Sequence, residues 1–338
     1  MGRATQFAIL AARLALADAG LQPRDVAPAR AGVTIGTTSG EPKVVERLQD
    51  SRAAGGPDDD ALRELAAAYP SHLIPARVAS DVGFRGPALT IPTACAAGNH
   101  AIAHAVDLLR AERADIVLAG GADAFSRITF TGFARLGAIA PDTCRPFDRH
   151  RKGMVPGEGS AMLVLETAAG AARRGARIYA EVAGCGLSCD AFHMTGGEPS
   201  GAGAVRAMEA ALSDAGLTPD AVSYISAHGT GTPANDRLEA LAIARVFGDR
   251  ARRIPVSSIK SMLGHAMGAA SAIEAAVCAL ATTEHRIPPT LHYDTPDPDC
   301  DLDCVPNEAR ELHVRVAMNN AYGFGGNNAS VLFREWRS

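Results

Sequence analysis

Cys95 stands where a side chain could attack a substrate. It follows the apolar stretch 87–91, which predicts a strand, and precedes the run 98–109, which is rich in small residues and predicts a helix. The N-terminus of a helix has unpaired N–H groups and a partial positive charge, and both lower the pKa of a nearby thiol. The segment therefore indicates a nucleophilic cysteine, and a buried structural cysteine fits it equally well.

Two histidines stand at similar junctions between predicted elements. His228 directly follows the apolar stretch 222–227 and precedes the sequence Gly-Thr-Gly-Thr. His265 precedes the Ala-rich helical stretch 269–281 and follows Lys260 by five positions. One histidine beside an apolar strand is usually a core residue whose ring is satisfied by its neighbours. Two histidines at junctions flanked by glycine fit a catalytic site better.

The stretch 319–328 reads Asn-Asn-Ala-Tyr-Gly-Phe-Gly-Gly-Asn-Asn and follows a predicted strand. Its glycines allow positive φ angles and a close approach of the backbone to a ligand. A tight turn is the simpler alternative. The segment thus adds a fourth candidate part of a site to the cysteine, the histidines and the lysine.

Strands and helices alternate along most of the chain, which predicts an α/β fold with mixed or parallel sheets. Because 338 residues exceed the usual size of one hydrophobic core, we expect two halves, residues 1–167 and 168–338, that share one body. The expected helices are 5–19, 62–68, 98–109, 202–215, 238–247 and 269–281, and the expected strands are 31–37, 87–91, 116–119, 161–165, 178–184, 222–227, 256–258, 315–319 and 330–334.

The composition is that of a soluble globular enzyme, with 47% hydrophobic residues, 21% charged residues and a net charge of −4. A nucleic-acid surface would need clustered basic residues, and no such cluster stands out. No apolar run is long enough to span a bilayer, and the N-terminal stretch reads as an amphipathic helix, not as a signal peptide. We therefore expect a cytoplasmic protein with neither a membrane nor a nucleic-acid partner.

The sequence contains seven cysteines. An odd number without a secretory signal indicates free thiols in a reducing compartment. The pairs Cys185/Cys189 and Cys300/Cys304 are conceivable zinc ligands, but neither pair has the short spacing of a zinc knuckle. Partly buried, inert thiols are the favoured interpretation, and we expect no metal site.

The four segments together resemble the β-ketoacyl-acyl-carrier-protein synthases, in particular the elongating enzymes of fatty-acid and type II polyketide assembly. The resemblance runs through nearly all of the chain. It implies a five-layered thiolase-type fold (αβαβα), two similar halves related by a pseudo-two-fold axis, and a dimer of identical chains or with a second ketosynthase-like subunit. Further stretches that carry the resemblance are 119–123, 145–148, 157–159, 190–195 and 306–310.

The resemblance implies an acyltransferase. Cys95 would take an acyl chain from an acyl carrier protein, and the backbone N–H groups of Cys95 and Phe324 would stabilise the oxyanion. Malonyl-carrier protein would then lose CO2, and His228 and His265 would each donate an N–H to the resulting enolate. The enolate would attack the thioester and release a β-ketoacyl product. No cofactor is implied, because the substrates are carried on the phosphopantetheine of the carrier protein.

The resemblance also assigns supporting roles. Lys260 would set the charge and orientation around His265, and Glu274 would pair with Lys260 behind the site. The alternative for this pair is an exposed ion pair on a helix surface, worth less than ~1 kcal/mol. Thr230 and Thr232 match positions that hydrogen-bond the phosphopantetheine arm. Phe324 matches a gating aromatic, and Phe133 lies roughly where relatives line the acyl tunnel.

The chain also departs from the family pattern. Relatives carry an additional N-terminal strand before the helix that starts here at about Arg3, so we expect the first sheet to lack a strand. Gly231 in place of serine, Asn327 in place of threonine and the compact segment 135–142 favour a secondary-metabolite enzyme over housekeeping fatty-acid synthesis. The alternatives are a non-catalytic chain-length-type partner, which usually lacks the cysteine, an inactive truncated ketosynthase, and a thiolase, which the paired histidines disfavour.

Overall fold

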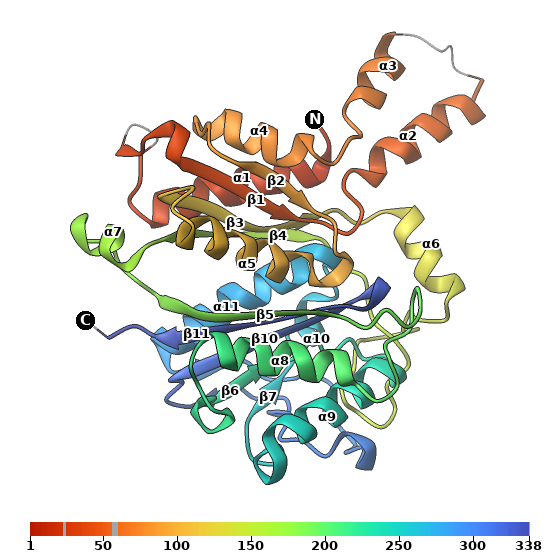
Figure 1. Cartoon of the computed structure of the whole chain (residues 1–338). Coiled ribbons are helices and arrows are strands. Elements are labelled where there is room, and N and C mark those ends of the chain that lie inside the picture. Colours follow the sequence, from red (N-terminus) through yellow and green to blue (C-terminus); the bar gives the residue numbers. More distant parts are fainter. Residues whose placement is uncertain (23–24, 56–59, 338) are drawn as a thin grey trace.

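The computed structural model describes residues 1–22, 25–55 and 60–337 (Figure 1). Two mixed sheets form its body. The first has the strand order β2-β1-β3-β4 and the second β5-β11-β10-β6-β7. The strands of the first sheet are β1 (Ala31–Gly36), β2 (Ala88–Ile91), β3 (Ile116–Asp123) and β4 (Gly159–Glu166), and those of the second are β5 (Ala180–Cys189), β6 (Tyr224–Ser226), β7 (Val256–Ser257), β10 (Val316–Gly323) and β11 (Asn327–Glu335).

Helices cover both outer faces of the two sheets and fill the space between them (Figure 1). The layers follow the order helix, sheet, helix, sheet, helix, which confirms the five-layered arrangement that the resemblance implies. The outer helices of the first sheet are α1 (Arg3–Asp18) and α4 (Leu73–Val82), the central helices are α5 (Ala97–Arg110) and α11 (Ala270–Glu284), and the outer helices of the second sheet are α8 (Ala202–Asp214) and α9 (Pro233–Phe247).

The two central helices meet through small side chains. A Cβ atom on Gly98 of α5 would lie 2.5 Å from the backbone nitrogen of Ala272 in α11, so a larger residue could not be accommodated without moving one helix. This close packing brings the N-terminal end of α5 next to the N-terminal end of α11. The Ala-rich composition of both helices thus fixes the place where the chemistry-bearing residues meet.

The two sheets have the same arrangement of four strands. β2-β1-β3-β4 corresponds to β7-β6-β10-β11, with two parallel pairings followed by one antiparallel pairing in each sheet. β5 pairs antiparallel with β11 at the edge of the second sheet. In the described residues, β4 is an edge strand of the first sheet. The boundary between halves at 167/168 stays a prediction.

Three helices project beside this body, and only one of them was expected from the sequence, as the helix at 62–68. α2 (Pro42–Ala53) and α3 (Asp60–Ala67) extend away from the sheets, and α6 (Arg127–Arg135) packs against α2 (Figure 1). In α2 only Pro42 and Val44 are buried, so the helix has no apolar stripe to reveal it in the sequence. The remaining elements are α7 (Ala168–Arg173), α10 (Lys260–Leu263), β8 (Arg286–Ile287) and β9 (Arg310–Glu311).

No helix in the described part of the chain combines the length and the apolar character that a bilayer crossing requires.

Candidate active site

Cys95 lies between the end of β2 and the start of α5, in the short 3-10 turn Ala94–Ala96. Its side chain is buried, with 5% of its surface exposed. Ala94 has a φ of +50°, a conformation that side-chain-bearing residues adopt rarely. A sharp turn held in this conformation points the thiol out of the strand–helix junction and into the centre of the molecule.

The expectation of a lowered thiol pKa is wrong. Burial raises the pKa of the Cys95 thiol to about 12, and the positive charge of Lys260 opposes this only in part. Asp123 and Glu274 act in the same direction as burial. The sequence reveals the junction but not its depth, and desolvation of the thiolate outweighs the field of the helix N-terminus. The resting residue is therefore a neutral thiol.

His228 and His265 come from different segments and face each other beside Cys95. His228 follows β6, and His265 lies between α10 and the turn that leads into α11. Their ring centroids are 5.4 Å apart with the planes at 83°. One ring nitrogen of each lies within 4.8 Å of the other and of the Cys95 sulfur. The three residues that the sequence separates by up to 170 positions thus form one cluster.

Both imidazoles are held in the neutral form. Burial lowers the pKa of His228 and of His265 well below the usual value, and the Lys260 ammonium lowers both further. A neutral imidazole carries one N–H that can donate a hydrogen bond. Its other nitrogen can accept a proton. The pair therefore presents donors towards the space beside the cysteine without adding positive charge.

Lys260 and Glu274 form an ion pair in which each side chain is 1% exposed, so the exposed-pair alternative is wrong. Burial raises the pKa of Glu274 to about 7, although Lys260 acts in the opposite direction. A buried pair of this kind costs desolvation and contributes little net stability. The position of the pair beside the histidines explains its presence better. Lys260 supplies the charge that lowers the imidazole pKa values, and Glu274 holds Lys260 in place.

Glu239 is a buried carboxylate of α9 that the sequence did not single out. It accepts hydrogen bonds from the backbone nitrogens of His228 and Gly229, both at 2.8 Å. Burial raises its pKa to about 8, whereas these two hydrogen bonds lower it. Glu239 thereby fixes the turn that carries His228. The buried face of α9 also carries Asp236, so no local pattern in the sequence marks Glu239.

The glycine-rich segment is a hairpin turn between β10 and β11, in which Gly323 pairs with Asn327. A Cβ atom on Gly323 would lie 2.9 Å from the carbonyl oxygen of Thr93 and 3.2 Å from the nitrogen of Cys95. Only glycine allows this approach, which sets the turn against the cysteine. Asn327 donates a hydrogen bond of 3.0 Å to the carbonyl oxygen of Phe324 and so braces the turn. The tight turn is confirmed, and the backbone of the segment closely approaches the cysteine turn.

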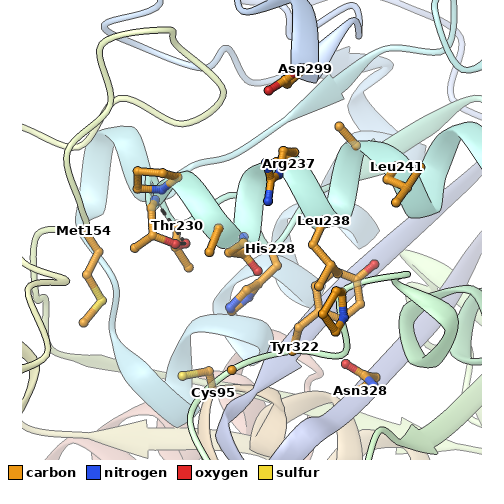
Figure 2. Close-up of a pocket in the computed structure, with 18 of the residues that line it drawn as sticks. Cys95, Met154, His228, Thr230, Arg237, Leu238, Leu241, Asp299, Tyr322 and Asn328 are labelled. Carbon is orange, nitrogen blue, oxygen red and sulfur yellow. Dashed lines mark hydrogen bonds between the residues drawn. The ribbon is translucent and has the colours of Figure 1, made fainter. Parts of the chain in front are cut away.

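A cavity of about 1140 Å³ opens onto Cys95, His228 and His265. Thr230 and Thr232 line it, and their hydroxyl groups are 2.8 Å apart. In Figure 2, Cys95 and the ring of His228 lie at one end of the cavity, and Arg237, Leu241 and Asp299 lie towards the other. The cavity therefore joins the buried Cys95 and His228 to the charged residues Arg237 and Asp299 in one continuous space.

Phe133 and Phe324 stand together in the wall of this cavity, with ring centroids 5.4 Å apart. Phe133 comes from α6 and Phe324 from the hairpin, so two segments from opposite halves of the sequence form one aromatic contact. Lys260 and Glu274 do not line the cavity and lie behind the histidines. The residues expected at the site are thus gathered around one cavity, with this pair in a supporting position.

A buried polar network joins the cysteine turn to the second sheet. The Asn319 amide donates to Asn99 and to the carbonyl oxygen of Ser271, both at 2.8 Å. The Ser271 hydroxyl donates in turn to the carbonyl oxygen of Cys95 at 3.3 Å. The sequence gives no sign of this network, since asparagine and serine are common in turns.

The cysteine pairs considered as zinc ligands lie apart from this cavity. Cys185 and Cys189 belong to β5, and Cys300 and Cys304 pack in the core of the second half. All four are free thiols. In the described ranges, only two groups have three ligand atoms within 4.8 Å of one another, and neither includes these cysteines. One of the two groups is Cys95 with His228 and His265.

Two family models match the chain. The one described as "Beta-ketoacyl synthase, N-terminal domain" matches residues 1–171, and the one described as "Beta-ketoacyl synthase, C-terminal domain" matches residues 179–294. Among similar proteins, "Nodulation protein E" of Rhizobium meliloti (strain 1021) is 46% identical over 99% of this chain and 83% of that protein. "3-oxoacyl-[acyl-carrier-protein] synthase 2" of Staphylococcus aureus (strain N315) is 41% identical over 100% of this chain and 83% of that protein.

Solved structures agree with these matches. "The ishigamide ketosynthase/chain length factor" superposes with a TM-score of 0.95 at 45% identity. The superposition covers 100% of this chain and 83% of the chain in that structure. A type II acyl-carrier protein in complex with its ketosynthase bound to the hexaketide also gives a TM-score of 0.95, at 36% identity, over 99% of this chain and 85% of that one.

Proposed function

Because the chain belongs to the β-ketoacyl synthase family, with the thiolase-type fold and the acyltransferase chemistry of a ketosynthase, we propose that it performs the decarboxylative Claisen condensation of an acyl group on Cys95 with malonyl-acyl-carrier protein. The product is β-ketoacyl-acyl-carrier protein. The observation that carries this proposal is the cluster of Cys95 with two neutral histidines in one buried cavity.

Loading comes first. The Cys95 sulfur attacks the thioester carbonyl of acyl-carrier protein, the new C–S bond forms, and the carrier thiol leaves with the proton that Cys95 gives up. The raised pKa of Cys95 means that this proton must move during the attack. Neutral imidazoles within 4.8 Å of the sulfur supply an unprotonated nitrogen for its transfer. The backbone N–H groups of Cys95 and Phe324 are the proposed donors to the oxyanion.

Condensation follows. The malonyl carboxylate leaves as CO2, and the electron pair of the broken C–C bond passes to the thioester carbonyl as an enolate. His228 and His265 donate hydrogen bonds to that oxygen, a role that needs the neutral form in which burial and Lys260 hold them. The enolate carbon then attacks the acyl-Cys95 carbonyl, and the Cys95 thiolate leaves and takes up a proton. Decarboxylation itself drives the reaction, so no cofactor is required.

The partners follow from the same chemistry. Both substrates are thioesters of acyl-carrier protein, and the long cavity lined by Thr230 and Thr232 suits the extended phosphopantetheine arm. Similar solved structures include a ketosynthase with its acyl-carrier protein and ketosynthases with chain length factors. We therefore propose a dimer, with an identical chain or a ketosynthase-like subunit. These neighbours, together with Gly231 and Asn327, favour polyketide-type over housekeeping fatty-acid synthesis.

The test is acyl transfer measured by intact-protein mass. The purified chain is incubated with a set of acyl-carrier proteins that carry acyl groups of different length, and the adduct is located by peptide mapping. A thioester on Cys95 in the parent and none in Cys95→Ala supports the proposal. An adduct that persists in Cys95→Ala would show that another residue is the nucleophile.

The second candidate function is a non-catalytic partner subunit, suggested by the likeness to structures that contain a ketosynthase together with a chain length factor. It predicts no acyl adduct from any donor, although the protein unfolds cooperatively on heating. The same assay with an added ketosynthase subunit separates the two candidates. A partner subunit would increase product formation by the added enzyme without carrying the acyl group itself.

A further inference from the structure

Three side chains from separate segments meet at the C-terminal end of β11, away from the cavity. His285 directly follows α11, His313 lies between β9 and β10, and Glu335 is the last residue of β11. One ligand atom of each lies within 4.8 Å of the others. We propose that His285, His313 and Glu335 bind a divalent transition-metal ion such as Zn²⁺.

Both imidazoles lie beside the Glu335 carboxylate, each next to a different oxygen. Nε2 of His313 lies 3.3 Å from Oε2 of Glu335, and Nε2 of His285 lies 3.7 Å from Oε1 of the same carboxylate. Metal–ligand bonds of about 2.0–2.2 Å at tetrahedral angles separate neighbouring ligand atoms by about 3.3–3.6 Å. The His313 nitrogen already lies at such a distance, whereas the His285 nitrogen faces the other carboxylate oxygen at 3.7 Å and must move slightly closer for one ion to bind both rings.

The two rings can reach a common ion with a small movement. They are stacked, with centroids 4.3 Å apart and planes at 17°. The side chains of His285 and His313 are 39% and 54% exposed, so either ring can tilt without disturbing the core. In the described structure, Nδ1 of His285 is buried without a hydrogen-bond partner, and nothing commits that ring to one tautomer.

The donor set selects the class of metal. Imidazole nitrogens suit zinc, copper and nickel, whereas magnesium and calcium prefer all-oxygen sites. Three protein ligands leave a fourth position for water. Arg337 donates two hydrogen bonds to Oε2 of Glu335, at 3.2 and 3.0 Å. Its charge opposes a cation at the site, so a bound metal must displace this arginine.

A metal at this site would connect three parts of the fold. α11 carries Glu274 near its other end, β11 begins at the hairpin that holds Phe324, and the segment with His313 leads into β10. An ion that binds only where these segments meet stabilises the folded chain by mass action. The site thus offers a metal-dependent clamp on elements that also position the cavity.

The experiment uses Trp336, the one tryptophan in the sequence, which directly follows Glu335. Cu²⁺ is titrated into the protein while Trp336 fluorescence is recorded, and Zn²⁺ is then added as a competitor that does not quench. Cys95→Ala provides the background, because Cys95, His228 and His265 form the other group that could hold a metal. We expect saturable quenching in this background that Zn²⁺ reverses.

His313→Ala and Glu335→Gln should each raise the half-saturating metal concentration by more than about tenfold, since loss of even an outer partner costs about 10–100-fold in affinity. Arg337→Ala should lower it. His72→Ala removes an exposed histidine at the N-terminus of α4 and should change nothing. Melting curves without metal confirm that each variant is folded.

Zn²⁺ should also raise the melting temperature of the Cys95→Ala protein and not that of the Cys95→Ala/His313→Ala protein. Quenching that does not saturate, or that His313→Ala leaves unchanged in a folded protein, would overturn the proposal. So would metal binding that disappears with Cys95→Ala alone, because the ion would then occupy the cavity.

Discussion

The Cys95 thiol is neutral at rest, because burial raises its pKa to about 12 despite the nearby Lys260 charge. The sequence identified the residue and the strand–helix junction but predicted a lowered thiol pKa. The helix N-terminus can be predicted from the sequence, whereas the depth of burial cannot. A neutral thiol is protected from oxidation and alkylation and reacts only when a bound substrate allows proton transfer. The neutral histidines beside it complete this arrangement.

The state of the thiol can be read from its alkylation rate. We expect the rate of Cys95 alkylation by iodoacetamide to rise about tenfold per pH unit through pH 7–9, because the thiolate fraction does so well below a raised pKa. Quenched-flow samples analysed by peptide mass spectrometry give the rate at Cys95 alone, and the exposed Cys189 serves as an internal comparison. A rate that is already constant at pH 7 would show a thiolate and contradict the account.

Lys260 acts on the histidines through its charge, which lowers the pKa of both. Lys260→Met should raise both pKa values. As the pH falls, the histidines of the variant therefore become protonated at a higher pH, and the neutral form that donates to the enolate is lost earlier. Malonyl decarboxylation measured against pH should therefore show its acid-side decline shifted upward in the variant. Lys152→Met removes a lysine outside the cluster and serves as the control; an unshifted decline in Lys260→Met would refute the electrostatic role.

At the scale of elements, the hairpin between β10 and β11 sets Phe324 against the cysteine turn. Sequence reasoning identified this segment from its glycines and placed the central strands and helices well, because α5, α11 and β10 are long and apolar or rich in alanine. It missed α2, whose exposed polar surface leaves no helical pattern. Contacts such as Glu239 with the His228 turn depend on folding and leave no local signal.

Gly323 tests this element directly. Gly323→Ala places a methyl group 2.9 Å from the Thr93 carbonyl oxygen and 3.2 Å from the Cys95 nitrogen, so the hairpin must move away from the cysteine. We expect acyl loading to fall by more than about tenfold, because small displacements of reacting groups are costly. Stopped-time mass analysis of the acyl adduct measures the effect.

Gly132→Ala in α6 is the matched control, because its added methyl group meets no atom within 4 Å. It should leave loading unchanged and stabilise the protein by up to about 1 kcal/mol, the usual gain for glycine to alanine in a helix. Equal loss of loading in both variants would mean that the hairpin approach is not the cause.

At the scale of the whole molecule, two sheets with the same strand order face each other across α5 and α11, and the cavity is completed by both halves. The alternation of strands and helices was enough to predict an α/β fold of two halves. The family resemblance, rather than periodicity, supplied the five layers. Which buried polar groups join the halves could not be predicted, because such contacts span up to 220 positions of the chain, as between Asn99 and Asn319.

Asp123 is the clearest of these joining groups. At the end of β3 it accepts hydrogen bonds from the Thr37 hydroxyl and from the backbone nitrogens of Thr38, Ser39 and Gly268. Asp123→Ala leaves several buried donors without an acceptor, which should cost about 3 kcal/mol or more in the free energy of unfolding. Urea unfolding measures this.

Asp115→Ala provides the comparison for Asp123. Asp115 pairs with Arg30 at the surface, so its loss should cost no more than about 1 kcal/mol. A cost for Asp123→Ala no larger than that for Asp115→Ala would show that Asp123 does not hold the loop 37–39 and the turn at Gly268 together.

The most direct test of the central claim is a single turnover of the acyl-loaded protein with malonyl-carrier protein labelled in its free carboxyl group. The account predicts that labelled CO2 is released as the acyl group leaves Cys95, and that the carrier protein gains a β-ketoacyl chain one two-carbon unit longer than the acyl group loaded. His265→Ala should reduce CO2 release more than loading. Transfer of the acyl group to the carrier without CO2 release and without chain extension would contradict the proposed condensation.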